Sequence, residues 1–363
     1  MQSRNLLATV EYVLLYTVKG GHLMDHPDEI VCLVGENPLP VYLGARQFAN
    51  KDCTTVVLLH SEQTKEQASR IESQLTDHVN ESKCVSVDAY NPKSVTSVVS
   101  GLKTKLKYQL LNYTGGTKVM AAFAVKAWAD DTTAFYLDEG EAKFWFGNGT
   151  DRELSGNYIN TDVLCELHGV VVKHRSNHDF ENSISTDTLH KLFDKWPRPK
   201  RGTPYNRAPF MPDTWGDLGV TDADCAIAVA ERWAQFKEMS GLFPKICAPT
   251  SAKALKEGDY KHQYKFAATT WQELLVQKSI EKCEHKGFIK GTYFDIGGQD
   301  FEADLIGVWN NRLYYISCTT DHKVGMVKAK AFEAVYRARQ LGGGMARIAV
   351  VSFANDNDFP MCL

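Results

Sequence analysis

The sequence has no apolar run near the roughly 20 residues that a membrane-spanning helix needs. Its first 23 residues are only briefly similar to a signal peptide, because Glu11 interrupts the apolar stretch and no clear cleavage site follows. We expect residues 1–29 to be an N-terminal extension, either a short extra element or an upstream start with Met24 as the older one. No membrane partner is expected.

Paired cysteines are also lacking. The nine cysteines are odd in number, scattered and free of any C-x-x-C pair: Cys32, Cys53, Cys84, Cys165, Cys225, Cys247, Cys283, Cys318 and Cys362. This pattern argues against a zinc ribbon and against a disulfide framework. A reducing, cytoplasmic setting is therefore expected.

A strong excess of one charge is absent as well. The 41 Lys and Arg residues nearly balance the 44 Asp and Glu residues, so the net charge is −3. This balance argues against a uniformly basic nucleic-acid coat but leaves room for a local basic groove. A hydrophobic content of 44% excludes a disordered tail protein and a collagen-like fibre. The length of 363 residues predicts two or three domains, and no internal repeat is visible.

Apolar strand patterns alternate with helical patterns in the first part of the chain. The predicted strands cover residues 30–34, 55–60, 84–87, 108–113 and 133–137, and the predicted helices cover 38–50, 64–79, 92–105 and 117–130. A further strand at 143–146 is expected to pair with its predecessor as a hairpin. Alternation of this kind predicts a parallel sheet covered on both faces, a Rossmann-like domain over about residues 28–150.

The middle of the chain has a different composition. Residues 191–207 hold six Lys and Arg residues and one acid, and five of the twelve prolines lie between Pro197 and Pro212. Such a segment cannot be a long helix or a central strand. It is interpreted as a solvated linker or as a contact to nucleic-acid phosphates, with Trp196 or Tyr205 available to stack on bases. A small helical or winged-helix module is expected around it.

The last part predicts a second α/β unit. A helix at 270–286 is followed by strands at 293–296, 302–309 and 313–318, a helix at 327–341 and a strand at 346–353. Asn310 and Asn311 stand between two apolar runs, which is a hairpin signal.

One candidate binding site lies where the fourth strand passes into a helix. Thr114, Gly115, Gly116, Thr117 and Lys118 combine a tight turn, hydroxyl groups and a cation with the N–H groups of a helix N-terminus, which favour an anion. The spacing is neither that of a Walker loop nor G-x-G-x-x-G. A tight turn with a capping threonine is the alternative interpretation.

Two other loops are expected at the same sheet edge. One carries Glu36 and Asn37 after the first strand, and the other carries Ser61 and Thr64 after the second. In a parallel sheet such loops line the crevice that binds ligands. An ordinary helix cap is the alternative interpretation for the second loop.

These segments resemble a known family. LVGENPLP, VVLLHSEQTKEQA, LLNYTGGTKVMAAFA and YLDEGEAKFWF, in this order, are similar to the CARF domain, the Rossmann-fold sensor of type III CRISPR ancillary effectors. The resemblance implies a homodimer that binds a cyclic oligoadenylate, most often cyclic tetra-adenylate. It assigns ligand phosphate and ribose to Thr114–Lys118, and makes Glu36, Asn37, Ser61 and Thr64 weaker candidates for base and ribose contacts.

The last part resembles a second family. WQELLVQKSIEK and FEADLIGVWNNRLYYISC are similar to the PD-(D/E)XK nuclease domain that is fused to CARF sensors. The resemblance implies a restriction-endonuclease-like domain that uses Mn²⁺ or Mg²⁺ to cleave or nick DNA or RNA. The expected division is an extension at 1–29, a CARF domain at 30–158, a linker and helical module at 159–255 and a nuclease-like domain at 256–363.

Carboxylates that converge on a metal are what such a nuclease needs. Glu273 on the helix and Asp304 on the strand are the first candidates, and Glu302 is expected on the same strand face as Asp304. We therefore predict a metal site made by these three acids. The alternative is that all three are solvated surface residues.

The motif is incomplete in one respect. Ser317 stands at the acid position of the family's E-x-K motif, where serine also occurs, and Thr319 stands at the lysine position. Thr319 has no charge to replace the lysine, and Lys323 is the speculative substitute. The two resemblances in one chain imply a nuclease that cyclic tetra-adenylate activates. The missing lysine makes a catalytically decayed sensor one alternative, and a ring nuclease that degrades its own activator is another.

Overall fold

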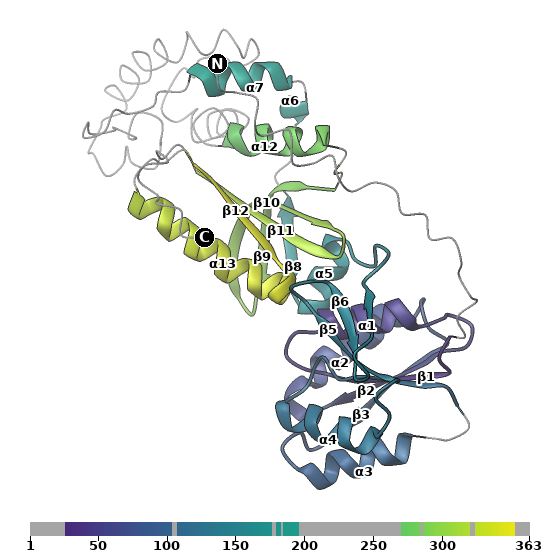
Figure 1. The fold of residues 1–363 in the computed structure, drawn as a ribbon. Helices are drawn as coiled ribbons and strands as arrows, with labels where there is room; N and C mark the ends of the chain where they lie inside the picture. The colour runs from purple at the N-terminus through teal and green to yellow at the C-terminus, as the bar shows by residue number, and fades with distance from the viewer. Residues whose placement is uncertain are drawn as a thin grey trace, which may run out of the picture.

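The computed structural model describes residues 26–103, 107–175, 179–182, 184–195, 270–283, 285, 287–319 and 324–352. Two α/β units follow each other along the chain (Figure 1). No helix in this part of the chain is long and apolar enough to cross a membrane. Most of the middle segment, including the prolines from Pro197 on, lies outside the described residues.

The first unit is a seven-stranded sheet in the order β3-β2-β1-β4-β5-β6-β7. Strands β1 to β5 run parallel, while β6 and β7 run antiparallel to their neighbours. Its strands are β1 (Glu29–Leu33), β2 (Thr55–His60), β3 (Glu81–Ser86), β4 (Gln109–Asn112), β5 (Ala134–Asp138), β6 (Lys143–Phe146) and β7 (Asp151–Glu153). The strands alternate with helices α1 (Leu39–Phe48), α2 (Lys65–Leu75), α3 (Pro92–Leu102) and α4 (Lys118–Trp128), and with the short helix η1 (Glu62–Thr64).

Helices cover both faces of this sheet, as the apolar strands require. Ile30 and Leu58 pack with α1 and α2 on one face, while Val31 and Leu59 pack with α3 and α4 on the other. Because both faces of the sheet are covered, the sequences of its buried parallel strands are near-continuous apolar runs. The prediction of a Rossmann-like N-terminal sheet is confirmed.

The second unit is a mixed sheet in the order β12-β11-β10-β9-β8. Its strands are β8 (Val171–Arg175), β9 (Ile289–Ile296), β10 (Gln299–Trp309), β11 (Arg312–Thr319) and β12 (Arg347–Ser352). The helices of this part are α5 (Thr161–His168), α6 (Asp179–Asn182), α7 (Thr186–Lys195), α12 (Trp271–Lys282) and α13 (Val324–Gly342), with η4 (Gly343–Met345) after them. The predicted α/β class of the C-terminal part is confirmed.

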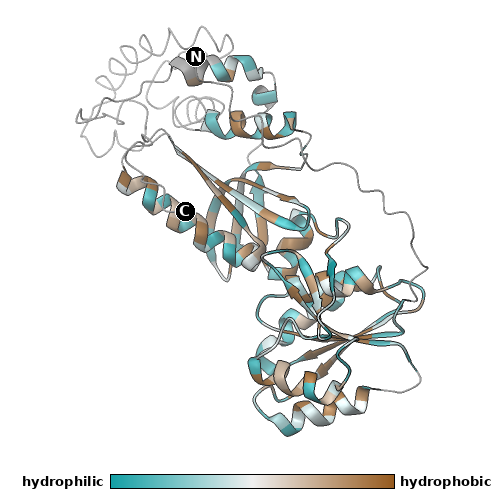
Figure 2. Ribbon diagram, in the orientation of Figure 1, coloured by the Kyte–Doolittle hydropathy of each residue, from teal (hydrophilic) through white to brown (hydrophobic). Residues whose placement is uncertain are grey.

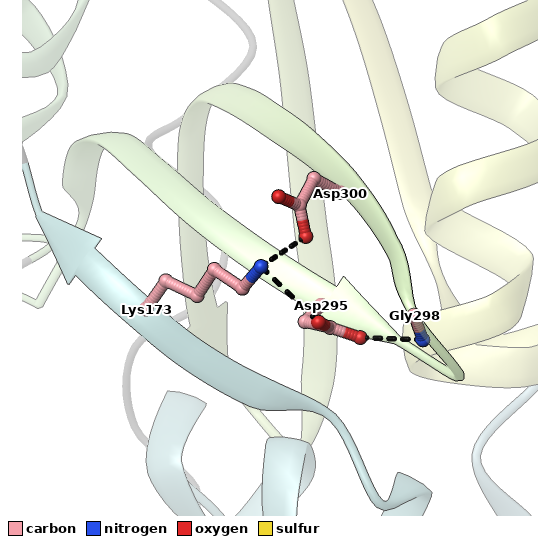
Figure 3. Close-up of polar contacts among 4 residues, drawn as sticks. All are labelled: Lys173, Asp295, Gly298 and Asp300. Atoms are coloured by element: carbon pink, nitrogen blue, oxygen red, sulfur yellow. Dashed lines mark hydrogen bonds and ion pairs between the residues drawn. The ribbon is translucent and has the colours of Figure 1, made fainter.

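Strand β8 joins this sheet from the stretch in which a helical module is expected. It pairs antiparallel with β9, so the C-terminal sheet draws on residues before the middle segment. Figure 3 shows how Lys173 of β8 reaches across to Asp295 and Asp300, while the Gly298 N–H donates to Asp295. The sequence pattern VVKHR, with three polar residues in a row, has no buried periodicity and therefore gave no strand signal.

Helix α5 connects the two units. Leu164 and Leu167 of α5 belong to one continuous apolar cluster that contains Leu58 of the first sheet and Tyr315 of the second. Figure 2 shows apolar positions on the strands of both sheets. Because buried apolar area is the main favourable term in folding, a shared cluster couples the two units.

The predicted hairpin turn between β10 and β11 also connects them. Asn310 and Asn311 have φ values of 49° and 58°, the left-handed pair that a tight hairpin turn needs. Asn311 is only 2% exposed: its Nδ2 donates to the Gly156 carbonyl and its Oδ1 accepts from the Tyr158 N–H, both at 2.6 Å. The turn is thus hydrogen-bonded to the segment that leaves the first sheet.

The cysteines divide into two groups. Cys32, Cys165 and Cys318 are buried, whereas Cys53, Cys84 and Cys283 are exposed. The six described cysteines are all free thiols.

Candidate functional site

Four loops meet at the carboxyl edge of the first sheet. They follow β1, β2, β3 and β4, which run parallel. Strands β2 and β3 are added on one side of β1 and strands β4 and β5 on the other, so the loops after β1 and β4 lie at a topological switch point. Open α/β sheets bind their ligands at such a point.

The loops after β1 and β4 touch through their backbones. A Cβ atom on Gly115 would lie 2.1 Å from the Leu33 carbonyl oxygen, and one on Gly35 would lie 2.9 Å from the Gly116 nitrogen. Gly116 has a φ of +77°, a conformation that side chains disfavour. The structure therefore places Gly115 and Gly116 at the switch point, with Gly35 opposite them.

Thr114 and Thr117 use their hydroxyl groups within the protein. Thr117 Oγ1 accepts from the Met120 N–H at 3.1 Å as the N-cap of α4, and it donates to the Ala89 carbonyl at 2.9 Å. Thr114 Oγ1 accepts from the Leu137 N–H at 2.8 Å. The side chain of Thr117 is thus a helix cap, while the backbone N–H groups of this loop and the exposed Lys118 are groups that suit an anion.

Ser61 and Thr64 bond to each other. Thr64 Oγ1 accepts from the Ser61 N–H at 3.0 Å and lies 3.3 Å from Ser61 Oγ, so the two form a capping box at the start of η1. Both residues are buried. The structure thus gives this pair a helix-capping role.

Asn37 and Glu36 differ in their surroundings. Glu36 is exposed at the sheet edge. Asn37 Oδ1 accepts from the Leu39 N–H, and Asn37 Nδ2 donates to Glu139 Oε2 at 3.3 Å. Glu139 also accepts from the Gly344 N–H of the second unit at 2.9 Å. Burial raises the pKa of Glu139, and the N–H groups of Gly344 and Met345 oppose that rise.

The sequence analysis did not identify the loop after β3 as part of this sheet edge. It covers residues 87–91, and the Ala89 carbonyl joins it to Thr117 of the β4–α4 loop. Tyr90 is 66% exposed there. Asn91 caps α3 and Pro92 begins it, which is a helix-start signal that also marks a loop at this sheet edge.

Asp304 is the centre of the second candidate site. Its Oδ2 accepts from Ser317 Oγ at 2.9 Å and from the Cys318 N–H at 2.7 Å. Burial raises the pKa of Asp304, as does the negative charge of Glu302, while the Lys330 ammonium group and these hydrogen bonds lower it. Ser317, at the acid position of the motif, therefore orients the carboxylate of Asp304.

Lys330 of α13 is a cation that the sequence analysis missed. It lies three residues after the buried Val327 and four before the buried Ala334, so it shares the sheet-facing stripe of α13. Its charge acts on both Asp304 and Cys318. The helical spacing was the available signal. Lys323, the substitute considered first, lies outside the described residues.

Glu273 approaches from α12. It is 6% exposed. Burial raises the pKa of Cys318, and the negative charges of Glu273 and Asp304 raise it further. Thr319 is buried at the end of β11 and places no cation at the lysine position. The alternative that all three acids are solvated does not hold for Glu273.

The donor set fits a small divalent cation only in part. Among the described residues, no three His, Cys, Asp or Glu side chains are grouped closely enough to hold a metal ion. The expected convergence of Glu273, Glu302 and Asp304 is thus not seen there. Mg²⁺ is commonly bound by one or two carboxylates, with water and substrate phosphates as its other ligands. Glu302 and Asp304 are two carboxylates whose charges interact, and they suit that kind of site.

The first sheet and its edge loops have the architecture of a Rossmann-like domain, the fold class to which CARF domains belong. Residues 30–153 match the family model of the Card1 CARF domain. This part of the chain is a CARF domain, as its loop motifs predicted. No curated protein matches the chain in sequence.

Two solved structures are similar in fold over most of the chain. Can2 from Sulfobacillus thermosulfidooxidans, in complex with cyclic tetra-adenylate, matches with a TM-score of 0.64 and 17% identity over 91% of each chain. Protein VC1899 from Vibrio cholerae matches with a TM-score of 0.63 and 14% identity, over 91% of this chain and 90% of that one. At these identities the likeness is one of fold: a CARF sheet followed by a mixed sheet.

Proposed function

We propose that the protein is a homodimeric, cytoplasmic sensor of cyclic tetra-adenylate in type III CRISPR defence, with a C-terminal domain that hydrolyses phosphodiester bonds in DNA or RNA. The observation that carries the sensor part is the glycine contact of the β1–α1 and β4–α4 loops at the switch point. Can2, which shares the fold, was solved with cyclic tetra-adenylate.

The ligand is anionic, and this edge of the sheet offers what an anion needs. The N-terminus of α4 provides free N–H groups and the positive end of a helix dipole, and Lys118 adds a full charge. A cyclic tetranucleotide has a phosphate for each nucleotide, so two such edges that face each other across a two-fold axis suit it. The proposed homodimer follows from that symmetry.

Contacts between ligand loops and the second unit provide a route for activation. Thr114 bonds to Leu137 at the end of β5, and Asn37 bonds to Glu139 two residues later. Glu139 in turn bonds to Gly344. The next residue, Gly140, accepts at its carbonyl from the guanidinium groups of Arg312 and Arg347 at 3.1 and 3.2 Å. A ligand that moves either loop therefore shifts the β5–β6 turn against the C-terminal sheet.

Glu302 and Asp304 are the residues that would hold a Mn²⁺ or Mg²⁺ ion, with Glu273 as a third candidate. Such a metal supplies charge at the phosphate and activates a water molecule. Ser317 and the Cys318 N–H keep the Asp304 carboxylate in place, and Lys330 provides the positive charge that Thr319 lacks.

A non-catalytic sensor is the second candidate function. It is favoured by Ser317 and Thr319 at the positions of the E-x-K acid and lysine, and by the absence of a three-acid group among the described residues. In that case the C-terminal domain would bind nucleic acid or a partner without cutting.

Purified full-length protein separates these functions. It is incubated with cyclic tetra-adenylate, Mn²⁺ or Mg²⁺, and single-stranded or supercoiled substrates, beside the Asp304→Asn variant. Ligand-dependent cutting that Asp304→Asn abolishes supports the nuclease, and cutting that survives this change contradicts the site. Absence of cutting under every condition contradicts the nuclease and leaves the non-catalytic sensor as the proposed function. Chromatography of labelled ligand detects a linear product if the CARF pocket degrades its activator.

The sensor part is tested by Lys118→Ala. Loss of a charge-assisted phosphate contact should weaken cyclic tetra-adenylate binding severalfold. Lys126→Ala, at the exposed far end of the same helix, is the matched control. Equal affinity of the Lys118 variant and the unaltered protein would argue strongly against the assigned pocket.

A further inference from the structure

Helix α13 has two unlike faces. Val327, Ala334, Ala338 and Leu341 are buried against the C-terminal sheet. The opposite face repeats every three or four residues with Lys328, Phe332, Tyr336 and Arg339, so these four side chains form one stripe. Figure 1 shows α13 running along the C-terminal sheet. We call this stripe the outer face of α13.

The outer face exposes two large aromatic rings between two cations. Phe332 is 75% exposed and Tyr336 is 58% exposed. Lys328 and Arg339 are exposed as well. Covering these two rings with a partner would remove apolar area from water, which is favourable. Aromatic residues are enriched at the surfaces through which proteins bind their partners.

The Tyr336 side chain is held in place before any partner arrives. Gln340 Nε2 donates to Tyr336 Oη at 3.1 Å, and Arg337 donates to Gln340 Oε1 at 3.0 Å. The Arg337 guanidinium also lies 5.4 Å from the centre of the Tyr336 ring. A fixed ring loses little conformational entropy when a flat group stacks on it.

The positive charge of α13 indicates what kind of partner its outer face binds. Residues 324–342 carry Lys328, Lys330, Arg337 and Arg339 against the single acid Glu333, although the whole chain has a net charge of −3. Bases that stack on aromatic rings while cations follow the phosphates are typical of single-stranded nucleic-acid binding. A duplex does not present its base faces in this way.

A second copy of the chain suits this face less well. A two-fold contact pairs the same surface on both subunits. The four residues of the outer face include no carboxylate, so a contact confined to them would give Lys328 and Arg339 no acidic partner, and cations brought close together cost free energy.

We propose that the outer face of α13 binds single-stranded nucleic acid, with Phe332 and Tyr336 stacking on bases and Lys328 and Arg339 contacting phosphates. This inference rests on the proposed action of the C-terminal domain on nucleic acid. It assigns strand binding to residues outside the Asp304 site and outside the CARF pocket.

Fluorescence anisotropy of a labelled oligo-dT strand tests the proposal. The full-length Asp304→Asn variant is used with cyclic tetra-adenylate, so that cleavage does not disturb the measurement. Phe332→Ala and Tyr336→Ala should each weaken binding at least about fivefold, the lower end for loss of one stacked base. Lys328→Ala and Arg339→Ala should each reduce the salt dependence of binding by about one phosphate contact.

Tyr108→Ala removes an exposed aromatic ring, 45% accessible, at the amino end of β4 and is the matched control. Oligo-dT affinity that is unchanged by both aromatic variants overturns the inference. A change from dimer to monomer for Phe332→Glu in sedimentation would also overturn it, because the face would then join two copies. Absence of cleavage by the unaltered protein, with binding intact and sensitive to Phe332, would contradict only the proposed nuclease.

Discussion

Asn37 and Glu139 are hydrogen-bonded although 102 residues separate them in the sequence. Asn37 belongs to the β1–α1 loop at the ligand edge, and Glu139 lies just beyond β5, where it also accepts from Gly344. A single carboxylate oxygen, Oε2, thus receives one donor from the sensor loop and one from the C-terminal unit. The two units are joined at this point by polar contacts as well as by the apolar cluster around α5.

Glu139→Ala should separate ligand binding from its effect on the C-terminal unit. We expect the affinity for cyclic tetra-adenylate to change less than about twofold, since Glu139 contacts the β1–α1 loop through Asn37 and is not itself among the proposed ligand-binding residues. Ligand-induced changes in hydrogen exchange at residues 343–345 should disappear. Glu139→Gln retains an acceptor oxygen and should keep most of the response. A full response in Glu139→Ala would exclude this route of coupling.

Lys330→Ala should lower ligand-dependent cleavage by about tenfold or more, because it removes a cation whose charge acts on Asp304. Without that charge the pKa of Asp304 should rise further, so the acid limb of the pH–rate profile should move to higher pH. Lys282→Ala, at an exposed position of α12, serves as the control. An unaltered rate and pH profile would assign Lys330 to packing alone.

Asn311→Gly should destabilise the protein by about 1–3 kcal/mol. Glycine keeps the left-handed turn, so the loss reports the two hydrogen bonds to Gly156 and Tyr158. Asn310→Gly tests the same turn at an exposed neighbour and should change the free energy of unfolding by less than about 0.5 kcal/mol. Urea unfolding of both variants measures the difference. Similar values for both would mean that the contact across the two units contributes little.

His168 should make the protein less stable in mild acid. Burial, together with the positive charge of Arg70, lowers the pKa of His168 from its ordinary value near 6.5 to about 4. At a pH between these two pKa values, the unfolded chain therefore binds a proton at His168 that the folded chain does not bind. The free energy of unfolding is therefore not reduced by His168 above about pH 6.5, and protonation of the unfolded chain reduces it by roughly 3 kcal/mol as the pH drops toward 4.

Unfolding curves at pH 7 and pH 5 measure this effect, with His168→Gln as the comparison. The glutamine variant should lose that part of the pH dependence. An equal slope in both proteins would assign the acid sensitivity to other groups.

Local patterns were sufficient to predict the elements of the first sheet. The apolar stretches of β2, β5 and β6 identified these strands within about a residue, because most of their side chains are apolar. Strand β3 begins three residues earlier than expected. Its first residues, Glu81–Lys83, are polar and lie on an edge strand, where no burial pattern is needed.

The roles of individual polar residues were harder to predict. Thr117, Ser61 and Thr64 have the residue types of a ligand loop, yet their hydroxyl groups cap helices, and sequence cannot tell these uses apart. Lys330 depends on how α13 is rotated against the sheet, and Glu139 on how two units pack. Helical spacing places Lys330 on the sheet-facing stripe of α13, but which carboxylate it approaches, like the contacts of Glu139, is a property of tertiary structure.

The distribution of thiols has a practical consequence for measuring how the sensor moves. Burial raises the pKa of Cys32 to about 12 and that of Cys165 to about 12, so neither is a ready nucleophile for a maleimide dye. Cys53 before β2 and Cys283 after α12 are exposed and belong to different units. With the remaining accessible thiols replaced, a dye pair on these two native positions would report the distance between the two units directly as cyclic tetra-adenylate, the proposed ligand, is added.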